Sequence, residues 1–173
     1  MYKRQPQSVF NISDVEETGK DFEENAILKA KNAFIKTNIS SVGDDSGLIV
    51  PAINNEPGLY SARYAGLNAT DSDNRNKLIS KLKDKKLEST YAYFFCCIVA
   101  VGIKGQNEII VCDGKVEGEV RTIERGEKGF GYDPMFYPKG YSESFAELNS
   151  LEKNKISHRG QALKKLMDKL NKT

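Results

Sequence analysis

The stretch that most constrains the fold covers residues 91–102 and reads YAYFFCCIVAVG. Successive residues of a strand point to opposite faces, and here both alternating sets of positions are apolar. Such a strand has to be covered on both sides of its sheet, because an exposed face would leave apolar surface in water. The sequence therefore predicts a buried strand in a sheet that other elements cover on both faces.

Apolar residues at three- and four-residue steps predict the helices of the fold. Thr18 followed by Asp21 resembles the start of a capped helix. The predicted helices cover residues 21–37, 70–83 and 157–171.

Strand and turn signals lie between these helices. Residues 40–50 resemble two short strands that are broken at Asp44 and Asp45. Further along, residues 105–107 predict a turn into the strand IIVCDG, residues 117–121 continue a strand, and residues 126–138 predict a shaped loop. Because helices and strands alternate early and a hairpin dominates the middle, we expect an α/β fold with a mixed, twisted sheet covered by helices.

Composition narrows the function classes. A chain of 173 residues suits one domain, or one domain with two lobes. With 26 basic and 24 acidic residues, the near-balanced charge argues against a nucleic-acid coat or a polybasic membrane surface. No apolar run reaches the roughly 18 residues of a membrane helix, and the first ten residues lack the apolar stretch of a signal peptide.

Cys96, Cys97 and Cys112 form no C-x-x-C pair, which excludes a disulfide framework and favours a reducing cytosol.

Two adjacent carboxylates, Asp44 and Asp45, interrupt the apolar pattern in SVGDDSGLIV. If the strand ends here, one carboxylate can face a cleft while the other supports the turn. Hard divalent cations such as Mg²⁺ bind to one or two carboxylates and leave room for substrate phosphates. The alternative interpretation is an ordinary Asp-Ser-Gly turn that the Asp side chains cap.

Acidic residues and a lysine accompany the first predicted helix. Glu16 and Glu17 precede it, and Lys29 lies within it. Taken alone, the acids are typical of a solvated helix start near the positive end of the dipole, and the lysine is typical of an exposed surface.

The hexapeptide GFGYDP, residues 129–134, is more specific. Two glycines around an aromatic residue allow a flat ligand to approach the backbone, and Phe130 could stack on a nucleotide base. The alternative is a Gly-rich turn in which the Phe and Tyr rings fill the core.

The tetrapeptide SHRG, residues 157–160, starts the last predicted helix and contains the only histidine, His158. Unpaired backbone N–H groups at a helix start favour an anion or a carbonyl oxygen, and Arg159 adds a planar fork of donors. The alternative is a histidine with a purely structural role. A single histidine excludes a His-pair metal site, and the absence of G-x-x-x-x-G-K-[ST] excludes a P-loop.

The order of these motifs resembles one known family. VEETG, ENAILKAK, DDSGL, PGLYSARYAG, GFGYDPMF and SHRGQALKKL follow one another as in the inosine triphosphate pyrophosphatase family, over about residues 14–171. The resemblance implies two lobes with a central nucleotide cleft. It also implies Mg²⁺-dependent cleavage of dITP, ITP or XTP between the α and β phosphates, which gives a nucleoside monophosphate and pyrophosphate.

The same resemblance leads us to expect a homodimer that binds a purine nucleoside triphosphate and Mg²⁺. The cysteines and the balanced charge lead us to expect a cytoplasmic protein with no nucleic-acid or membrane partner. Family members prefer purines that carry a 6-keto group and lack a normal 2-amino group, such as hypoxanthine and xanthine. Their role is to remove deaminated nucleotides before these reach DNA or RNA.

The resemblance also implies roles for individual residues. Asp45 matches the acid that activates water and helps to hold Mg²⁺, Asp44 and Glu17 match supporting acids and metal ligands, and Lys29 matches a catalytic lysine that faces the phosphates. The positions that match substrate contacts are Ser46, Phe130, Gly131, Tyr132, Asp133, Lys153, His158 and Arg159. Among these, Phe130 matches the stacking ring, and His158 and Arg159 match the residues that read the edge of the base.

Elementary chemistry agrees with this assignment. Negative charge builds on the leaving pyrophosphate, so lysines and a metal ion should face it. Donors on Arg159 and His158 can bond to the O6 atom of a keto purine. A 6-amino group would leave such buried donors unpaired, at about 1–3 kcal/mol each.

The start of the chain departs from the family pattern. Family chains begin with an apolar strand and a Thr-x-Asn-x-x-Lys loop, whereas here MYKRQPQSVF lies just before VEETG. We therefore expect residues 1–173 to be a single domain of this family that is incomplete at its N-terminus, with weak triphosphate binding and an exposed sheet edge. The alternatives are a nucleotide-binding fragment with impaired catalysis and a pyrophosphatase of other modified nucleotides.

Overall fold

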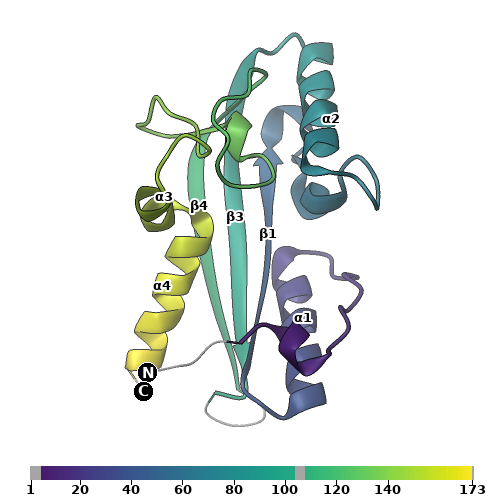
Figure 1. Ribbon diagram of the computed structural model, residues 1–173, viewed down its shortest axis with the longest axis vertical. Coiled ribbons are helices and arrows are strands. Elements are labelled where there is room, and N and C mark those ends of the chain that lie inside the picture. The colour runs from purple at the N-terminus through teal and green to yellow at the C-terminus, as the bar shows by residue number, and fades with distance from the viewer. Residues whose placement is uncertain (1–4, 104–107, 173) are drawn as a thin grey trace. The chain divides into compact units, whose positions relative to one another are not determined.

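The computed structural model describes residues 5–103 and 108–172 of the chain, and it contains one five-stranded sheet with the strand order β2-β1-β3-β4-β5 (Figure 1). The strands are β1 (Ser41–Val50), β2 (Glu56–Pro57), β3 (Ser89–Val101), β4 (Ile109–Arg121) and β5 (Phe136–Pro138). The helices are α1 (Phe22–Thr37), α2 (Asp71–Asp84), α3 (Ser150–Ile156) and α4 (His158–Asn171). Four short 3-10 helices complete the described elements: Gln7–Phe10, Pro51–Ile53, Gly58–Arg63 and Asp133–Met135. The predicted α/β class is confirmed.

The chain divides into two compact units. The first unit consists of Met1–Asp45, Cys97–Cys112 and Leu163–Thr173, and the second consists of Ser46–Cys96 and Asp113–Ala162. Each of β1, β3, β4 and α4 therefore contributes residues to both units. The expectation of a single domain stays a prediction.

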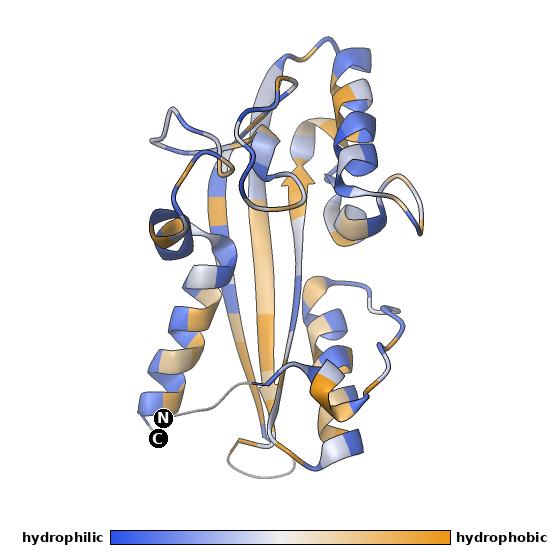
Figure 2. Cartoon of the chain, in the orientation of Figure 1, coloured by the Kyte–Doolittle hydropathy of each residue, from blue (hydrophilic) through white to orange (hydrophobic). Residues whose placement is uncertain are grey.

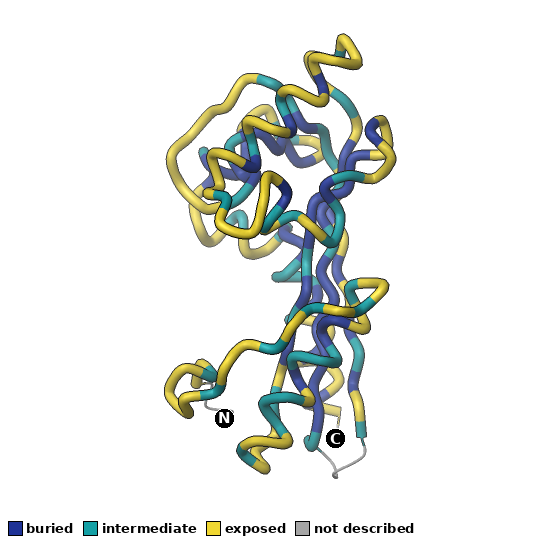
Figure 3. The backbone as a smooth tube through the Cα atoms, turned by 90° about the vertical axis from the view of Figure 1, so that its right-hand side faces the viewer, coloured by how far each residue is buried: buried dark blue, intermediate teal, exposed yellow. Residues whose placement is uncertain are grey.

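Strand β3 is the buried strand that the sequence predicts. Every residue from Cys96 to Val101 is buried, so both faces of this part of the strand are covered. Figure 2 shows the apolar character of β3, and Figure 3 shows that buried backbone is concentrated in the strands, whereas much of α2 is exposed. The predicted turn at residues 105–107 lies outside the described residues.

Helix α1 begins later than the predicted cap. Its N-cap is Asp21, whose side chain accepts a hydrogen bond from the backbone N–H of Glu24 at 2.8 Å. The prediction that Thr18 starts the cap is therefore wrong by three residues, because the carboxylate of Asp21 itself satisfies the free N–H group. Helix α2 begins as predicted, with Thr70 as N-cap and a reciprocal capping box to Asp73.

Strand β1 runs without a break through the Asp pair, so the prediction of two short strands is wrong. The side chain of Asp45 is buried and has polar partners, which removes the reason for the strand to end there. The strand IIVCDG and its predicted continuation over residues 117–121 form one strand, β4, in which buried and exposed residues alternate.

The second unit has its own apolar core. Leu78 and Leu82 of α2 are fully buried in it, and the aromatic rings of Phe94, Phe136 and Phe145 pack with centroids 4.7–6.1 Å apart. Between residues 5–103 and 108–172, no helix is both long enough and apolar enough to cross a membrane.

Candidate functional site

Asp45 lies at the centre of a polar cluster in the first unit. Its Oδ1 atom is 2.7 Å from the ammonium of Lys29, and its Oδ2 atom accepts a hydrogen bond from the amide of Asn25 at 3.1 Å. The same ammonium lies 2.7 Å from Oε1 of Glu17 and donates to the backbone carbonyl of Asp44 at 3.1 Å. The structure therefore brings the predicted catalytic pair, Asp45 and Lys29, into direct contact.

Close packing of α1 against β1 produces this contact. A side chain at Gly43 would lie 2.6 Å from the backbone oxygen of Ala26, so the glycine lets the helix approach the strand. Asn25 and Lys29 are four residues apart and therefore share one face of α1. The amide of Asn25 is fixed, since its Oδ1 accepts from the N–H of Gly19 at 2.8 Å.

The charges in this cluster shift one another's pKa values. Burial raises the pKa of Asp45 above its usual range, and the hydrogen bonds from Lys29 and Asn25 only partly offset this rise. Desolvation lowers the pKa of Lys29, but its hydrogen bonds to Asp45 and Glu17 raise the pKa by more, so the net direction is upward. Lys29 therefore remains an ammonium throughout the neutral range.

The predicted metal ligands are Asp45, Asp44 and Glu17. Within the part of the chain that the structure describes, no group of three or more His, Cys, Asp or Glu side chains is arranged to hold a metal ion. Asp45 and Glu17 nevertheless lie on either side of one ammonium group, so a cation already fits between their oxygens. Because Mg²⁺ commonly takes one or two carboxylates and completes its shell with water and phosphate, this donor set suits it. Asp44 contributes its backbone oxygen to Lys29.

The second unit holds the predicted base-binding loop. Phe130 is 61% exposed, whereas Tyr132 is only 3% exposed and donates from its hydroxyl to the carbonyl of Ser61 at 3.0 Å. The two aromatic residues of GFGYDP thus have different environments: Tyr132 anchors the loop in the core, and Phe130 is left exposed.

Asp133 organises this loop from within. Its buried carboxylate accepts from the N–H of Phe130 at 2.8 Å and is ion-paired with the ammonium of Lys153. That ammonium lies 5.0 Å from the centroid of the Phe130 ring. A side chain at Gly129 would lie 2.1 Å from Oδ2 of Asp133, which explains the glycine at this position.

Arg159 reaches the same loop from the start of α4. Its guanidinium carbon lies 5.7 Å from the centroid of the Phe130 ring, within the range of a cation–π contact. Its Nη2 atom is 3.4 Å from Oγ of Ser46, a long hydrogen bond. The structure therefore brings Ser46, Phe130, Asp133, Lys153 and Arg159 together in the second unit.

His158 is held against the core. Its ring stacks on Phe94 with centroids 4.7 Å apart, and Gly114 makes room for it, since a side chain there would lie 2.0 Å from the carbonyl oxygen of His158. Burial, together with the positive charges of Arg159 and Lys153, lowers the pKa of His158 to about 3. The imidazole is therefore neutral, and its buried Nδ1 atom has no hydrogen-bond partner among the described residues.

Sequence reasoning missed three residues of these clusters. Asn25 contacts Asp45, and its position four residues before Lys29 in ENAILKAK was an available signal. Asp71 and Arg75 of α2 contact Gly131, and no motif indicated that this helix reaches the loop. Helix α3 was also missed, although Asn149 and Glu152 have the spacing of a helix cap.

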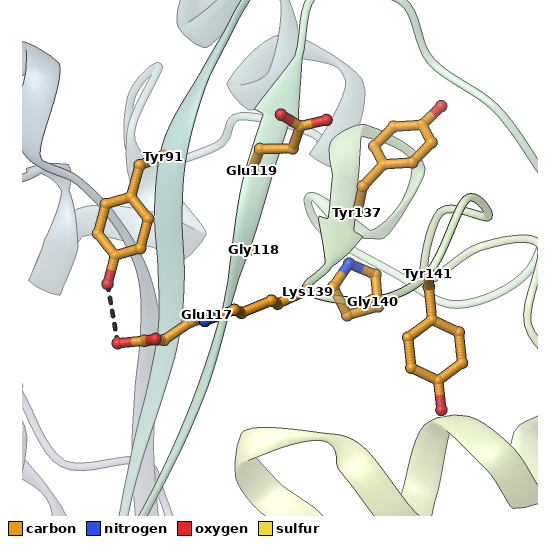
Figure 4. A pocket seen from close by; sticks show the side chains of 9 residues that line it. Tyr91, Glu117, Gly118, Glu119, Tyr137, Lys139, Gly140 and Tyr141 are labelled. Carbon is orange, nitrogen blue, oxygen red and sulfur yellow. Dashed lines mark hydrogen bonds between the residues drawn. The ribbon is translucent and has the colours of Figure 1, made fainter.

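A surface hollow of about 410 Å³ lies elsewhere in the second unit and includes none of the predicted site residues (Figure 4). It is lined by Tyr91, Glu117, Gly118, Glu119, Tyr137, Pro138, Lys139, Gly140 and Tyr141. Its carboxylates already have protein partners: Glu117 accepts from Tyr91 and Lys115, and Glu119 accepts from Arg121. We assign the candidate site to two clusters, the buried charges around Asp45 in the first unit and the exposed ring of Phe130 with its neighbouring cations in the second.

Comparison with known proteins shows the family of the chain. The sequence pattern of the Ham1 family matches residues 2–169. A protein of Idiomarina loihiensis named dITP/XTP pyrophosphatase is 47% identical over 167 residues, which cover 96% of this chain and 83% of that protein. A Bacillus anthracis protein of the same name is 46% identical over 160 residues, covering 92% of this chain and 79% of its own length. The solved structure of a HAM1 protein from Coxiella burnetii superposes with a TM-score of 0.90 at 43% identity, covering 97% of this chain and 85% of that one.

Proposed function

Because the chain belongs to the Ham1 family, we propose that it hydrolyses deaminated purine nucleoside triphosphates such as dITP, ITP and XTP to the monophosphate and pyrophosphate. The relatives named dITP/XTP pyrophosphatase support the reaction and the substrate class. The geometric observation that carries the proposal is the exposed Phe130 ring with the cations of Lys153 and Arg159 beside it. An aromatic platform next to positive charge suits a flat base that carries phosphates.

Asp45 and Lys29 would act on the phosphates. In the proposed reaction, the oxygen of a water molecule attacks the α phosphorus, and the bond from that phosphorus to the bridging oxygen breaks, so that pyrophosphate leaves. The Asp45 carboxylate orients this water and accepts its proton. The Lys29 ammonium offsets the charge that develops on the leaving group.

We propose Asp45 and Glu17, with Asp44 beside them, as the residues that hold Mg²⁺. When bound, the ion would neutralise phosphate charge and favour departure of pyrophosphate. Lys29 pairs with both carboxylates, so a bound ion would share these oxygens with its ammonium.

Arg159 and His158 would select the base. A guanidinium can only donate hydrogen bonds, so it matches the O6 acceptor of a 6-keto purine and opposes a 6-amino group. One ring nitrogen of the neutral His158 can either donate to O6 or accept from N1–H, depending on the tautomer.

We also propose that the chain acts in the cytoplasm as a homodimer, without a nucleic-acid or membrane partner. The three cysteines in the structure are buried free thiols, which is compatible with a reducing compartment. The near-balanced charge gives no general attraction to polyanions. Sedimentation equilibrium across a range of protein concentrations tests the dimer.

A pyrophosphate-release assay tests the function. Wild-type protein is incubated with dITP, XTP, ITP, GTP and ATP, each with Mg²⁺ and each with a chelator. The proposal expects rapid pyrophosphate release from the first three nucleotides, slow release from the last two, and none with chelator. Nucleotide binding without any release would instead identify a binding protein, and a preference for pyrimidine nucleotides would overturn the proposed substrate class.

A further inference from the structure

Helix α2 holds the base-binding loop at a single residue, Gly131. The carboxylate of Asp71 accepts a hydrogen bond from the N–H of Gly131, with Oδ2 and N 2.6 Å apart. The guanidinium of Arg75 donates to the carbonyl of Gly131, with Nη1 and O 2.9 Å apart. Asp71 and Arg75 are four residues apart, so they project from the same face of α2. Two side chains of one helix therefore hold both polar backbone groups of one glycine.

Gly131 is the residue of this loop whose backbone conformation depends most on the hydrogen bonds to α2. Its φ angle is +58°, in the left-handed region that glycine adopts readily, and nothing lies within 4 Å of the position a Cβ atom would occupy. A residue with this freedom and no side-chain packing is not fixed by its own contacts. The bonds from Asp71 and Arg75 fix the peptide groups before and after Gly131, and the first of these includes the carbonyl of Phe130.

The helix that provides this hold is itself well anchored. The side chain of Arg75 is 16% exposed, and its Nε atom lies 2.9 Å from Oε2 of Glu124, although the two atoms are not aligned as a hydrogen bond. The first turn of α2 is closed by the capping box of Thr70 and Asp73, and Leu78 is fully buried further along. Groups on a rigid element position a loop more accurately than groups on another loop do.

We propose that Asp71 and Arg75 are positioning residues that set the orientation of the Phe130 ring for stacking on the purine. Asp133 holds the N–H of Phe130 from inside the loop, and α2 holds the following residue from outside. Together they restrict the backbone on both sides of the ring, which lies 61% exposed. The inference rests on the proposed function, because it assigns the purine as the ligand of Phe130.

Kinetics of Arg75→Met test the proposal, with Lys83→Met as the matched control because Lys83 is an exposed cation on the same helix. We expect the KM for ITP to rise about tenfold in Arg75→Met, which corresponds to loss of one charged hydrogen bond, while kcat changes by less than about twofold. Arg75→Lys should restore part of the affinity, since an ammonium can still donate to the carbonyl. Lys83→Met should match the wild type. An unchanged KM in Arg75→Met would overturn the proposal.

A double-mutant cycle separates positioning from general stability. If Arg75 acts through the ring of Phe130, Arg75→Met should change KM by less than about twofold in a Phe130→Ala background. An equal rise in both backgrounds would assign Arg75 a merely structural role and would contradict the proposal.

Hydrogen exchange gives a readout that does not depend on turnover. We expect Arg75→Met to accelerate amide exchange in peptides covering residues 126–138, and Lys83→Met to leave it unchanged. Unchanged exchange in Arg75→Met would overturn the role of α2 even if the wild type is active. If Arg75→Met accelerates exchange but the wild type releases no pyrophosphate, the contacts of α2 with Gly131 still position the loop, and the proposed function is wrong.

Discussion

The ammonium of Lys29 lies 2.7 Å from Oδ1 of Asp45, so the carboxylate that we propose as the catalytic base is ion-paired with the proposed phosphate-facing lysine in the absence of nucleotide. The two groups come from α1 and β1, which approach closely at Gly43. Burial alone would favour the neutral form of Asp45, and Lys29 opposes that effect. The ion pair therefore favours the charged form of a buried carboxylate.

Asp45→Asn tests the role of that charge. The amide preserves the size of the side chain but cannot accept a proton from water, so we expect turnover of ITP to fall by about 100-fold or more. Pyrophosphate release under saturating Mg²⁺ and nucleotide measures the effect, and a thermal melt checks that the variant is folded. Asp84→Asn, at the exposed end of α2, is the matched control and should retain full turnover. Turnover within a few-fold of wild type in Asp45→Asn would remove Asp45 from the mechanism.

Lys29→Met should change the pH dependence of the reaction. Lys29 lowers the pKa of Asp45 through a hydrogen bond and through its charge, so removing it lets desolvation raise that pKa further. The activity that depends on ionised Asp45 should then be lost at higher pH than in the wild type. Profiles of kcat/KM against pH report this group in the free enzyme. An acidic limb that stays in place, or moves to lower pH, would show that Lys29 does not control the ionisation of Asp45.

His158 should make stability depend on pH below neutrality. Its pKa is about 3 in the folded protein and 6.5 in the reference state, so between these values the unfolded chain binds a proton that the folded protein does not. The contribution of His158 to the free energy of unfolding is therefore fully present above pH 6.5. Below that pH the free energy of unfolding falls, by up to about 1.4 kcal/mol per pH unit. Urea unfolding at several pH values measures the slope. His158→Gln cannot titrate and should give a flatter profile, whereas an identical slope in both proteins would contradict the depressed pKa.

The sequence predicted the local features of the fold better than the contacts between elements. The apolar pattern of β3 and the periodic pattern of α2 depend on neighbouring residues, and both elements were found at the predicted places. The continuity of β1 could not be predicted in the same way, because it depends on two residues of helix α1. Lys29 offsets the charge of Asp45, and the amide of Asn25 donates a hydrogen bond to it. The contacts of Asp71 and Arg75 with Gly131 join residues that are 60 and 56 positions apart along the chain, and they involve backbone groups, which no side-chain motif reveals.

Lys153→Met should destabilise the base-binding loop through its effect on Asp133. The Asp133 side chain is 4% exposed and is ion-paired with the Lys153 ammonium, so removing the ammonium leaves a buried carboxylate without its counter-charge. Losing one partner of such a pair typically lowers the free energy of unfolding by about 3 kcal/mol. Urea unfolding measures the loss. The double variant Lys153→Met with Asp133→Asn should recover much of it, because Asn removes the charge and keeps an oxygen that accepts from the N–H of Phe130. If the double variant is no more stable than Lys153→Met, the cost arises from lost packing of the lysine stem and not from the isolated charge.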